Sequence, residues 1–391
     1  MPMNSASAAA PSVAASSVTV ESVGNRATWN AFLKFARQVY ANDSYWVEPL
    51  RFERKRQWSP RNPWFEHAEA RAFLAWRDGR VVGTISAQVD RLQPDEGGRK
   101  LGYFGQLEAV DDARVFQALL DAARQWLLEQ GCGLMRGPYD LGINQSCGLL
   151  VDGRDSPPMV MMGHAPGYYA ERLLEAGLQP VMDLLAYLLA PDFPAPRAMT
   201  RLLERVGSRI RFRPMDFSRY DQETSLLRLL FNDAWSDNWG FVPLTKAEFH
   251  ATGRELRQII RPGYTCIAEV DGEPVGFIVA LPNINELISD LNGRLLPLGW
   301  LKLLWRLKRT AATTARVPLM GVKRAHQRGP LGAAISFGMI DQVRHALHAD
   351  GIREVELSWI LETNQGMNSL IEAMGGRLYK RYRMFQQLLE A

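Results

Sequence analysis

A duplicated hairpin is the feature that most constrains how this 391-residue chain can fold. In "ARAFLAWRDGRVVGTISAQVD" two apolar runs meet at Asp78-Gly79, a dipeptide that tolerates the positive φ angles of a tight hairpin turn. The phrase returns in "YTCIAEVDGEPVGFIVAL", where Asp271-Gly272 lies 193 residues further on and the chain again continues to Val-Gly. A repeat whose period is as long as a whole domain predicts two tandem copies of one fold.

The boundary between the two copies is marked by a proline-rich stretch, "LAPDFPAPRAMT". We therefore expect an N-terminal domain over residues 18–190, a linker over 191–208 and a C-terminal domain over 209–391. Residues 1–17 are rich in alanine, serine and proline, and they lack the basic and apolar regions of an export signal. They are predicted to form a disordered leader.

The composition predicts a soluble protein with two buried cores, because 47% of the residues are hydrophobic. Three cysteines, Cys132, Cys147 and Cys266, have neither paired spacing nor a metal-ligand pattern, so we expect reduced thiols, a cytoplasmic protein and no bound metal. The net charge of +4 would suit an anionic cofactor, a membrane or a nucleic acid equally. The basic residues gather beside a phosphate-binding pattern and an apolar insert, so we expect no nucleic-acid partner.

The strongest chemical signal is "ARVPLMGVKRAHQRGPLGAAISFGMIDQVRHALHADG", which reads as an apolar strand, a basic turn with two glycines, and a helix. The start of a helix leaves about four N–H donors unsatisfied and carries a partial positive charge, so phosphate groups bind there readily. The sequence therefore predicts an anion site at this turn. The residues that we expect at the site are Val322, Lys323, Arg324, Gln327, Arg328, Gly329, Gly332 and Ala333.

This order of strand, glycine-bearing loop, helix, strand and helix resembles the acyl-CoA-binding half of the GNAT superfamily of N-acyltransferases. The pyrophosphate loop of that family reads Gln/Arg-x-x-Gly-x-Gly/Ala, and two registers are open here. Arg328 as the arginine of the loop places Leu331 at the first glycine and Ala333 at the last position. Gly332 as the first glycine places Gly329 at the arginine instead.

A later run of the family, Asn-x-x-Ala-x-x-x-Tyr-x-x-x-Gly, is matched at Asn364 and Gly375, with Met367 and Ile371 in place of the alanine and the tyrosine. That tyrosine is often the general acid of the family, so the proton donor is not carried over at this position. The resemblance implies an α/β (α+β) fold of two tandem GNAT-like acyltransferase domains, with mixed central sheets flanked by helices. It implies acyl-CoA as the co-substrate, bound near Asn364 and the loop.

The first copy departs from the phosphate-binding pattern. It carries Asp111 and Asp112 where the loop should lie, and two carboxylates would repel a phosphate group. We therefore expect the N-terminal domain to be degenerate for CoA and the C-terminal domain to bind acyl-CoA.

Longer phrases narrow the resemblance. "GINQSCGLLVDG", "PPMVMMGHAPGYY", "DLNGRLLPLGWLKLLWRLK" and "WILETNQGMN" resemble a group of tandem GNAT proteins that includes the bacterial ceramide synthases. The resemblance implies transfer of a fatty acyl group from long-chain acyl-CoA to the amine of a sphingoid base or a similar lipid amine. Two alternatives are an aminoacyl transferase of the peptidoglycan type, whose usual long helical arm is absent from this sequence, and a non-catalytic acyl-CoA or lipid-binding protein.

The GNAT plan also implies positions for the catalytic groups. The end of the strand "ELSWILETN" lies beside the thioester in that plan, which makes Glu362 the first candidate for the base that removes the ammonium proton. Glu286 and Asp290 are the reserves. Tyr382 or Tyr379 is expected to protonate the departing thiolate.

Residues 136–169 are interrupted by glycine, proline, asparagine and aspartate where an ordinary strand and helix should lie. Such irregularity shapes either an acceptor pocket at the domain junction, a common place for ligand sites, or a structural loop that plugs the interface. The candidates to line a pocket are Tyr139, Asn144, His164 and Tyr169, with Trp239 from the second copy as a further substrate contact.

An apolar insert over residues 289–312 has the sequence "SDLNGRLLPLGWLKLLWRLKRTAA". At helical spacing Lys302, Arg306 and Arg309 share one face and leucines with Trp300 cover the remainder. A basic amphipathic helix of this kind is typical of a segment that lies in a membrane interface, and the alternative is a core helix with snorkelling basic side chains. We expect Trp300 to contact an apolar substrate, and the protein to be cytoplasmic or peripheral on the inner membrane.

Overall fold

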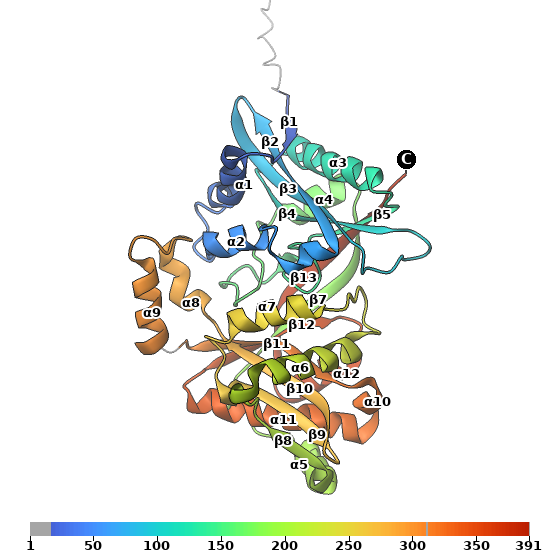
Figure 1. Ribbon diagram of the computed structural model, residues 1–391, viewed down its shortest axis with the longest axis vertical. Helices are drawn as coiled ribbons and strands as arrows, with labels where there is room; N and C mark the ends of the chain where they lie inside the picture. The colour runs from blue at the N-terminus through green and yellow to red at the C-terminus, as the bar shows by residue number, and fades with distance from the viewer. Residues whose placement is uncertain (1–16, 310–311, 391) are drawn as a thin grey trace, which may run out of the picture.

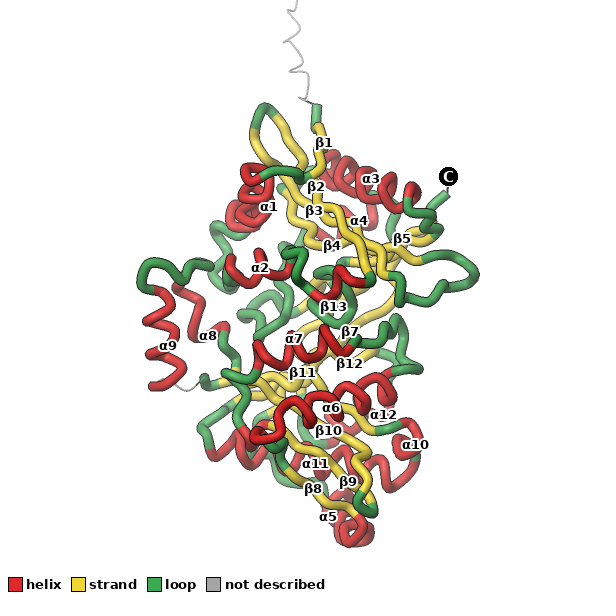
Figure 2. The backbone as a smooth tube through the Cα atoms, in the orientation of Figure 1, coloured by secondary structure: helices red, strands yellow, loops and turns green. Residues whose placement is uncertain are grey.

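The computed structural model describes residues 17–309 and 312–390 of the chain. The predicted leader therefore lies outside the described residues except for its last residue. Figure 1 and Figure 2 show an elongated molecule in which one twisted sheet runs from end to end and helices cover both of its faces. The first half of the chain builds one end of the molecule, and the second half builds the other end.

The sheet has 13 strands, 12 of them in one continuous path. From one edge to the other the path runs β1 (Thr19–Ser22), β2 (Ala68–Arg77), β3 (Arg80–Asp90), β4 (Leu101–Ala109), β5 (Leu134–Gly137), β13 (Arg377–Leu388), β7 (Gln179–Leu189), β12 (Glu354–Leu361), β11 (Thr314–Val322), β10 (Glu273–Pro282), β9 (Thr265–Val270) and β8 (Ile210–Arg213). The thirteenth strand, β6 (Leu149–Asp152), pairs with β13.

Both predicted hairpins form. Strands β2 and β3 are joined through Asp78 and Gly79, and β9 and β10 through Asp271 and Gly272. All four turn residues have positive φ angles, between 49° and 85°. Aspartate and glycine are the residues that adopt this conformation at least cost, which is why the same dipeptide marks both turns.

The two halves of the chain exchange strands at the centre of the sheet. Strand β13 is the last strand in the sequence, yet it lies between β5 and β7 of the first half. Strand β7, from the first half, lies between β13 and β12 and is antiparallel to both. The predicted mixed α/β class is confirmed, and the central sheets of the two copies are joined into one.

The helices are α1 (Arg26–Val39), α2 (Arg51–Gln57), α3 (Ala113–Glu129), α4 (Tyr169–Glu175), α5 (Arg197–Val206), α6 (Tyr220–Trp235), α7 (Lys246–Leu256), α8 (Asn285–Ile288), α9 (Gly299–Arg309), α10 (Arg324–Gln327), α11 (Gly329–Ala349) and α12 (Gln365–Ala373). In the second half, α11 packs on one face of the sheet and α6 with α7 on the other. Helix α5 fills most of the predicted linker, so that stretch is ordered structure, and the domain boundaries stay a prediction.

One buried carboxylate ties the exchanged strands together. Asp183 on β7 accepts hydrogen bonds from Arg381 at 2.8 Å and from Arg383 at 2.7 Å and 2.9 Å, both on β13. Burial opposes ionisation of Asp183, but the bonds from Arg383 and Arg381 outweigh it and lower the pKa of the carboxyl.

We expect Asp183→Asn to lower the free energy of unfolding by roughly 1–3 kcal/mol at neutral pH, the contribution of hydrogen bonds to a charged group. A lowered folded-state pKa stabilises the protein above the unfolded-state value, and this stabilisation is lost as the pH falls. The difference between wild type and variant, measured by urea unfolding, should therefore shrink below about pH 4. The exposed Asp192→Asn is the control, and equal stability of all three proteins would contradict the assignment.

Candidate active site

The parallel strands β11 and β12 are hydrogen-bonded over only the first half of their length and then separate. They pair from Thr314 with Glu354 to Val317 with Leu357, and beyond that point β11 continues to Val322 without bonding β12. Strand β12 likewise continues along β7 to Leu361. We call this opening the divergence. It separates two backbones that would otherwise bond each other, and it lies at the centre of the sheet.

A cluster of buried polar side chains lies at the divergence. Arg316 and Glu356 are 1% and 0% exposed, and their side chains approach to 3.3 Å. Ser358 accepts a hydrogen bond from the guanidinium of Arg316 at 2.9 Å and donates one to Glu356 at 2.5 Å. Tyr379 donates its hydroxyl to the other oxygen of Glu356. Sequence patterns did not single out Arg316, Glu356 or Ser358, because charged residues inside a β-strand are usually exposed.

Burial sets the protonation of the neighbouring groups. It raises the pKa of Tyr379 well above its usual range, and the charge of Glu356 adds to this effect. It raises the pKa of Tyr382 as well. It lowers the pKa of Lys380 to about 8. Both tyrosines are therefore protonated at neutral pH, and their hydroxyls already donate, Tyr379 to Glu356 and Tyr382 to the carbonyl of Gly163.

The face of the divergence that α11 does not cover is crossed by residues 156–165, which we call the strap. Except at Met162, every residue of the strap has a backbone carbonyl that accepts a hydrogen bond from a side chain. Three side chains each donate to two successive carbonyls: Lys380 to those of residues 156 and 157, Asn285 to 158 and 159, and Arg316 to 160 and 161. Three more each donate to one carbonyl: Tyr382 to that of residue 163, Tyr40 to 164 and Arg154 to 165. Most of these donors come from the second half of the chain. This part of residues 136–169 therefore plugs the interface, as one of the two sequence interpretations proposed.

The residues of the predicted anion site lie around the start of α11. Arg328 precedes the helix, and its side chain is exposed and has no ion-pair partner among the described residues. No side chain caps the first turn of α11, in which Pro330 supplies no N–H donor. Lys323 pairs instead with Glu273, Arg324 with Asp237, and Gln327 bonds two backbone carbonyls. Val322 is buried, and Ala333 is partly buried in α11.

The two glycines of this turn serve different purposes. Gly329 has a φ of 77° and open space around it. Gly332 is buried, and a Cβ there would lie 2.4 Å from the carbonyl oxygen of Gln327 and 2.5 Å from that of His326. The short helix α10, which the sequence did not predict, brings these carbonyls close. Gly332 is therefore required by packing between α10 and α11.

The first half lacks an open helix start at the corresponding place. Asp112 caps α3 by accepting from the N–H of Arg114 at 2.9 Å, and its carboxylate pairs with Arg77 at 2.8 Å. The hydrogen bond from the side chain of Arg114 is the largest cause that holds the pKa of Asp112 well below its usual range. A helix start that holds its own anion has no place for a phosphate group. This observation supports CoA binding by the second half alone.

The predicted catalytic carboxylates lie in different surroundings. Glu362 is exposed at the end of β12, and one of its oxygens accepts from the N–H of Asp183 at 2.9 Å. Glu286 accepts from the N–H groups of Thr313 and Thr314, at 2.8 Å and 2.9 Å, so it fixes the start of β11. Asp290 is bound by Lys302 and Arg306.

The remaining predicted residues divide between the junction and the core. Asn144 donates to the carbonyl of Val242 at 2.9 Å, and Trp239 lies over the guanidinium of Arg136 at 4.6 Å. Both contacts join the two halves. Tyr139 is 2% exposed in the core of the first half. Tyr169 is also buried there, and His164 bonds Asp43 at 2.8 Å. Asn364 caps α12 by accepting from the N–H of Met367 at 3.2 Å.

The insert turns its apolar side outward. Helix α9 packs inward through Leu303, and its Lys302 and Arg306 pair with Asp290. Its outward side chains, with two leucines that precede the helix, are 44–78% exposed; they are Leu296, Leu298, Trp300, Leu301, Leu304 and Trp305. Figure 1 shows α8 and α9 projecting beside α2. The core-helix interpretation is therefore wrong. The side chain of Arg309 lies outside the described part of the chain.

Within the described residues, none of the helices combines the length and the apolar character that crossing a bilayer requires.

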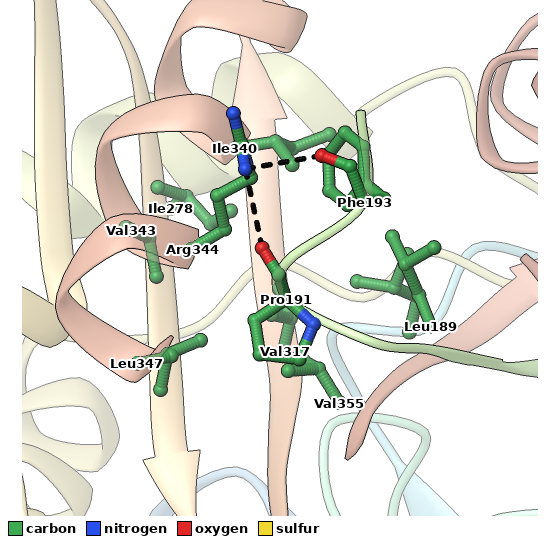
Figure 3. A pocket seen from close by; sticks show the side chains of 11 residues that line it. Leu189, Pro191, Phe193, Ile278, Val317, Ile340, Val343, Arg344, Leu347 and Val355 are labelled. Atoms are coloured by element: carbon green, nitrogen blue, oxygen red, sulfur yellow. Dashed lines mark hydrogen bonds between the residues drawn. The ribbon is translucent and has the colours of Figure 1, made fainter. Parts of the chain in front are cut away.

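An apolar pocket lies under α11 at the closed end of the divergence, where β11 and β12 are still paired. Val317 and Leu357, the last bonded pair of β11 and β12, both line it. Figure 3 shows Arg344 closing one side, where its guanidinium donates to the carbonyls of Pro191 and Phe193, both at 3.2 Å. The other side chains that line it are Leu189, Ile278, Ile340, Val343, Leu347 and Val355.

Comparison with known proteins gives two close relatives in sequence. The chain is 44% identical to the bacterial ceramide synthase of Caulobacter vibrioides (strain NA1000 / CB15N) over 362 residues, which cover 92% of this chain and 94% of that protein. It is 42% identical to protein YghO of Escherichia coli (strain K12) over 364 residues, 93% of each chain. No family model matches the sequence.

Among solved structures, the fold is similar to a tandem GNAT protein from the clavulanic acid biosynthesis pathway. The TM-score is 0.56, the sequence identity is 14%, and the match covers 96% of this chain and 99% of the other. At this identity the likeness concerns the fold alone, and it agrees with the shared sheet and the two GNAT-like halves.

We predict that Glu356→Gln lowers the free energy of unfolding by roughly 3–5 kcal/mol, because it leaves the buried guanidinium of Arg316 without its counter-charge. Glu354→Gln, an exposed change two residues earlier on the same strand, should stay within about 0.5 kcal/mol of wild type. Denaturant unfolding of the three proteins measures both values. Similar stability of the two variants would show that the buried pair is not required.

Proposed function

This chain belongs to the family of the bacterial ceramide synthase and is an N-acyltransferase of the GNAT fold, and on that premise we propose that it moves a fatty acyl group from acyl-CoA to the amine of a sphingoid base or a similar lipid amine. The observation that carries the proposal is the combination of an uncapped helix start, beyond the open end of the divergence, with an exposed apolar helix face elsewhere on the same half of the chain. The first suits a phosphorylated acyl donor, and the second suits a lipid.

The donor side of the proposal rests on α11. Its open N–H groups and the unpaired guanidinium of Arg328 are suited to the pyrophosphate of CoA. The divergence opens toward the end of β11 that precedes α11, and the apolar pocket lies at its closed end, under the second half of α11.

Arg328→Glu should weaken CoA binding by roughly tenfold or more, because it replaces an unpaired cation by an anion at the phosphate site. Arg353→Glu makes the same change at an exposed arginine before β12, and it should bind CoA like wild type. Isothermal titration calorimetry with CoA checks both variants. Equal affinity of Arg328→Glu and wild type would place the pyrophosphate elsewhere.

The chemical step needs one proton acceptor and one proton donor. The amine nitrogen attacks the thioester carbon, the C–S bond breaks, and the ammonium proton passes to a base. We assign this role to Glu362, because it lies at the open end of β12 and none of the described groups bonds its second carboxylate oxygen. Tyr379 or Tyr382 can protonate the thiolate. Glu356, whose two oxygens are already occupied, positions Arg316 and Tyr379.

Glu362→Gln should reduce kcat by about 10²–10⁴-fold while CoA affinity stays close to wild type, because it removes proton acceptance and leaves the phosphate donors intact. Single-turnover kinetics and calorimetry on the same samples separate the two effects. Glu354→Gln is again the control, and a wild-type kcat in Glu362→Gln would assign the base to another group.

The acceptor side of the proposal rests on α9. Its outward face exposes two tryptophans and two leucines, while Lys302 and Arg306 are turned toward Asp290. Such a face is unstable in water and suits the interfacial region of a bilayer, where a lipid amine resides. We propose that the protein associates peripherally with the inner membrane through this helix.

We expect wild-type protein to bind anionic vesicles at low salt. Each fully buried large side chain contributes roughly 1.5–3 kcal/mol, and the exposed Arg294 adds about 1 kcal/mol on an anionic surface. The double variant Trp300→Glu and Leu304→Glu should remain in the supernatant in co-sedimentation. Leu229→Glu, at an exposed leucine on α6, should bind like wild type. Wild-type protein left in the supernatant at low salt would exclude the membrane role.

A further inference from the structure

Helix α8 is a junction at which three consecutive residues hold three different elements. Asn285 donates its amide to the strap carbonyls of Pro158 and Met159, at 2.9 Å and 3.1 Å. Glu286 accepts from the first residues of β11. The carbonyl of Leu287 accepts from Arg306 of α9 at 2.6 Å. This one turn of helix therefore connects the exposed insert to the strap and to the strand that begins the divergence.

The insert and α8 form one packed unit. Asp290 follows α8 directly and binds both Lys302 and Arg306 of α9. Ile288 and Leu291 pack with Leu303 in one apolar cluster. A displacement of α9 would therefore carry α8 with it, because charge pairs and buried apolar contacts both join them.

The strap covers one face of the buried polar cluster at the divergence. Ala315 and Val317 of β11 point into the core under α11, so Arg316 between them points to the opposite face. On that face its guanidinium bonds the strap carbonyls at residues 160 and 161, at 3.0 Å and 3.4 Å. Lys380 and Tyr382 are likewise occupied by strap carbonyls. An acceptor that approaches from this face must displace the strap.

The strap is built to be displaced without unfolding the sheet. It belongs to no helix or strand, and side chains hold it at its carbonyls. Met161 has a φ of 62° and is 40% exposed, and Met159 and Met162 are partners that repack readily because methionine is flexible. Loss of the two bonds from Asn285 would release residues 158 and 159 of the strap, while β11 stays anchored by Glu286.

We propose that contact of α9 with a lipid surface is transmitted through α8 to the strap, so that the acceptor side of the site opens when the protein is at a membrane. This inference rests on the proposed function, since it assumes a lipid amine as the acceptor. It assigns Asn285 as a positioning residue that couples the membrane surface to the site, and it makes membrane contact a regulator of acyl transfer.

The kinetic test uses octanoyl-CoA and a water-soluble short-chain sphingoid amine, with and without mixed phosphatidylcholine and phosphatidylglycerol vesicles. Vesicles should raise the wild-type rate by roughly fivefold or more, a typical size for coupling between two sites. In Asn285→Ala the ratio of the two rates should fall toward one, although the variant still sediments with vesicles.

Asn292→Gly is the matched control, because it removes an asparagine of the same insert at a left-handed position that glycine adopts readily. It should keep the wild-type ratio. Equal rates with and without vesicles in wild type, or undiminished stimulation in Asn285→Ala, would overturn the coupling.

A second measurement does not depend on turnover. Hydrogen exchange of the peptide that contains residues 156–165 should speed up when wild-type protein binds the vesicles, and it should already be fast in Asn285→Ala without them. Strap exchange that is unchanged by bound vesicles overturns the inference whatever the activity. Absence of amide product under every condition, with faster strap exchange on vesicles, would contradict the proposed function and leave the coupling supported.

Discussion

The antiparallel pairing of β7 with β13 is the constraint on which the rest of the molecule depends. Because each strand comes from one half of the chain and lies beside strands of the other, neither half can complete its sheet alone. The pairing brings Tyr379, Lys380 and Tyr382 from the last strand to the centre of the sheet, next to Glu356 on β12. It also aligns Asp183 with two arginines of β13. The buried polar cluster at the divergence is thus assembled from residues far apart in the sequence.

Burying charge at such a junction is costly unless every group is paired. The structure meets this requirement by using backbone carbonyls of the strap as partners for Arg316 and Lys380, and hydroxyls as partners for Glu356. The same contacts keep water and substrate away from one face of the site. A strap that both satisfies buried cations and excludes the acceptor gives a physical reason for the unusual glycine- and proline-rich sequence between residues 136 and 169.

Much of the architecture could be predicted from sequence, because the signals were local. The Asp-Gly turns marked both hairpins, and the duplicated phrase indicated two copies of one fold. The start of α11 was marked by its glycines and basic residues. Other features depend on contacts distant in sequence: the exchange of β13, the buried pair of Arg316 and Glu356, and the ties from Glu286 to the start of β11. The helical pattern of residues 299–309 correctly separated a basic from an apolar face, but only the position of Asp290 determines which face points inward.

The central claim is that this enzyme joins a fatty acyl group from CoA to a lipid amine in the second half of the chain. The most direct measurement incubates the purified protein with a series of acyl-CoA donors and a series of amines that includes sphingoid bases, and follows amide product by mass spectrometry together with free CoA. We expect one amide to form for each CoA released, with long-chain donors and lipid amines preferred over acetyl-CoA and small polar amines. Turnover confined to acetyl-CoA or to small polar amines, or CoA release without amide formation, would contradict it.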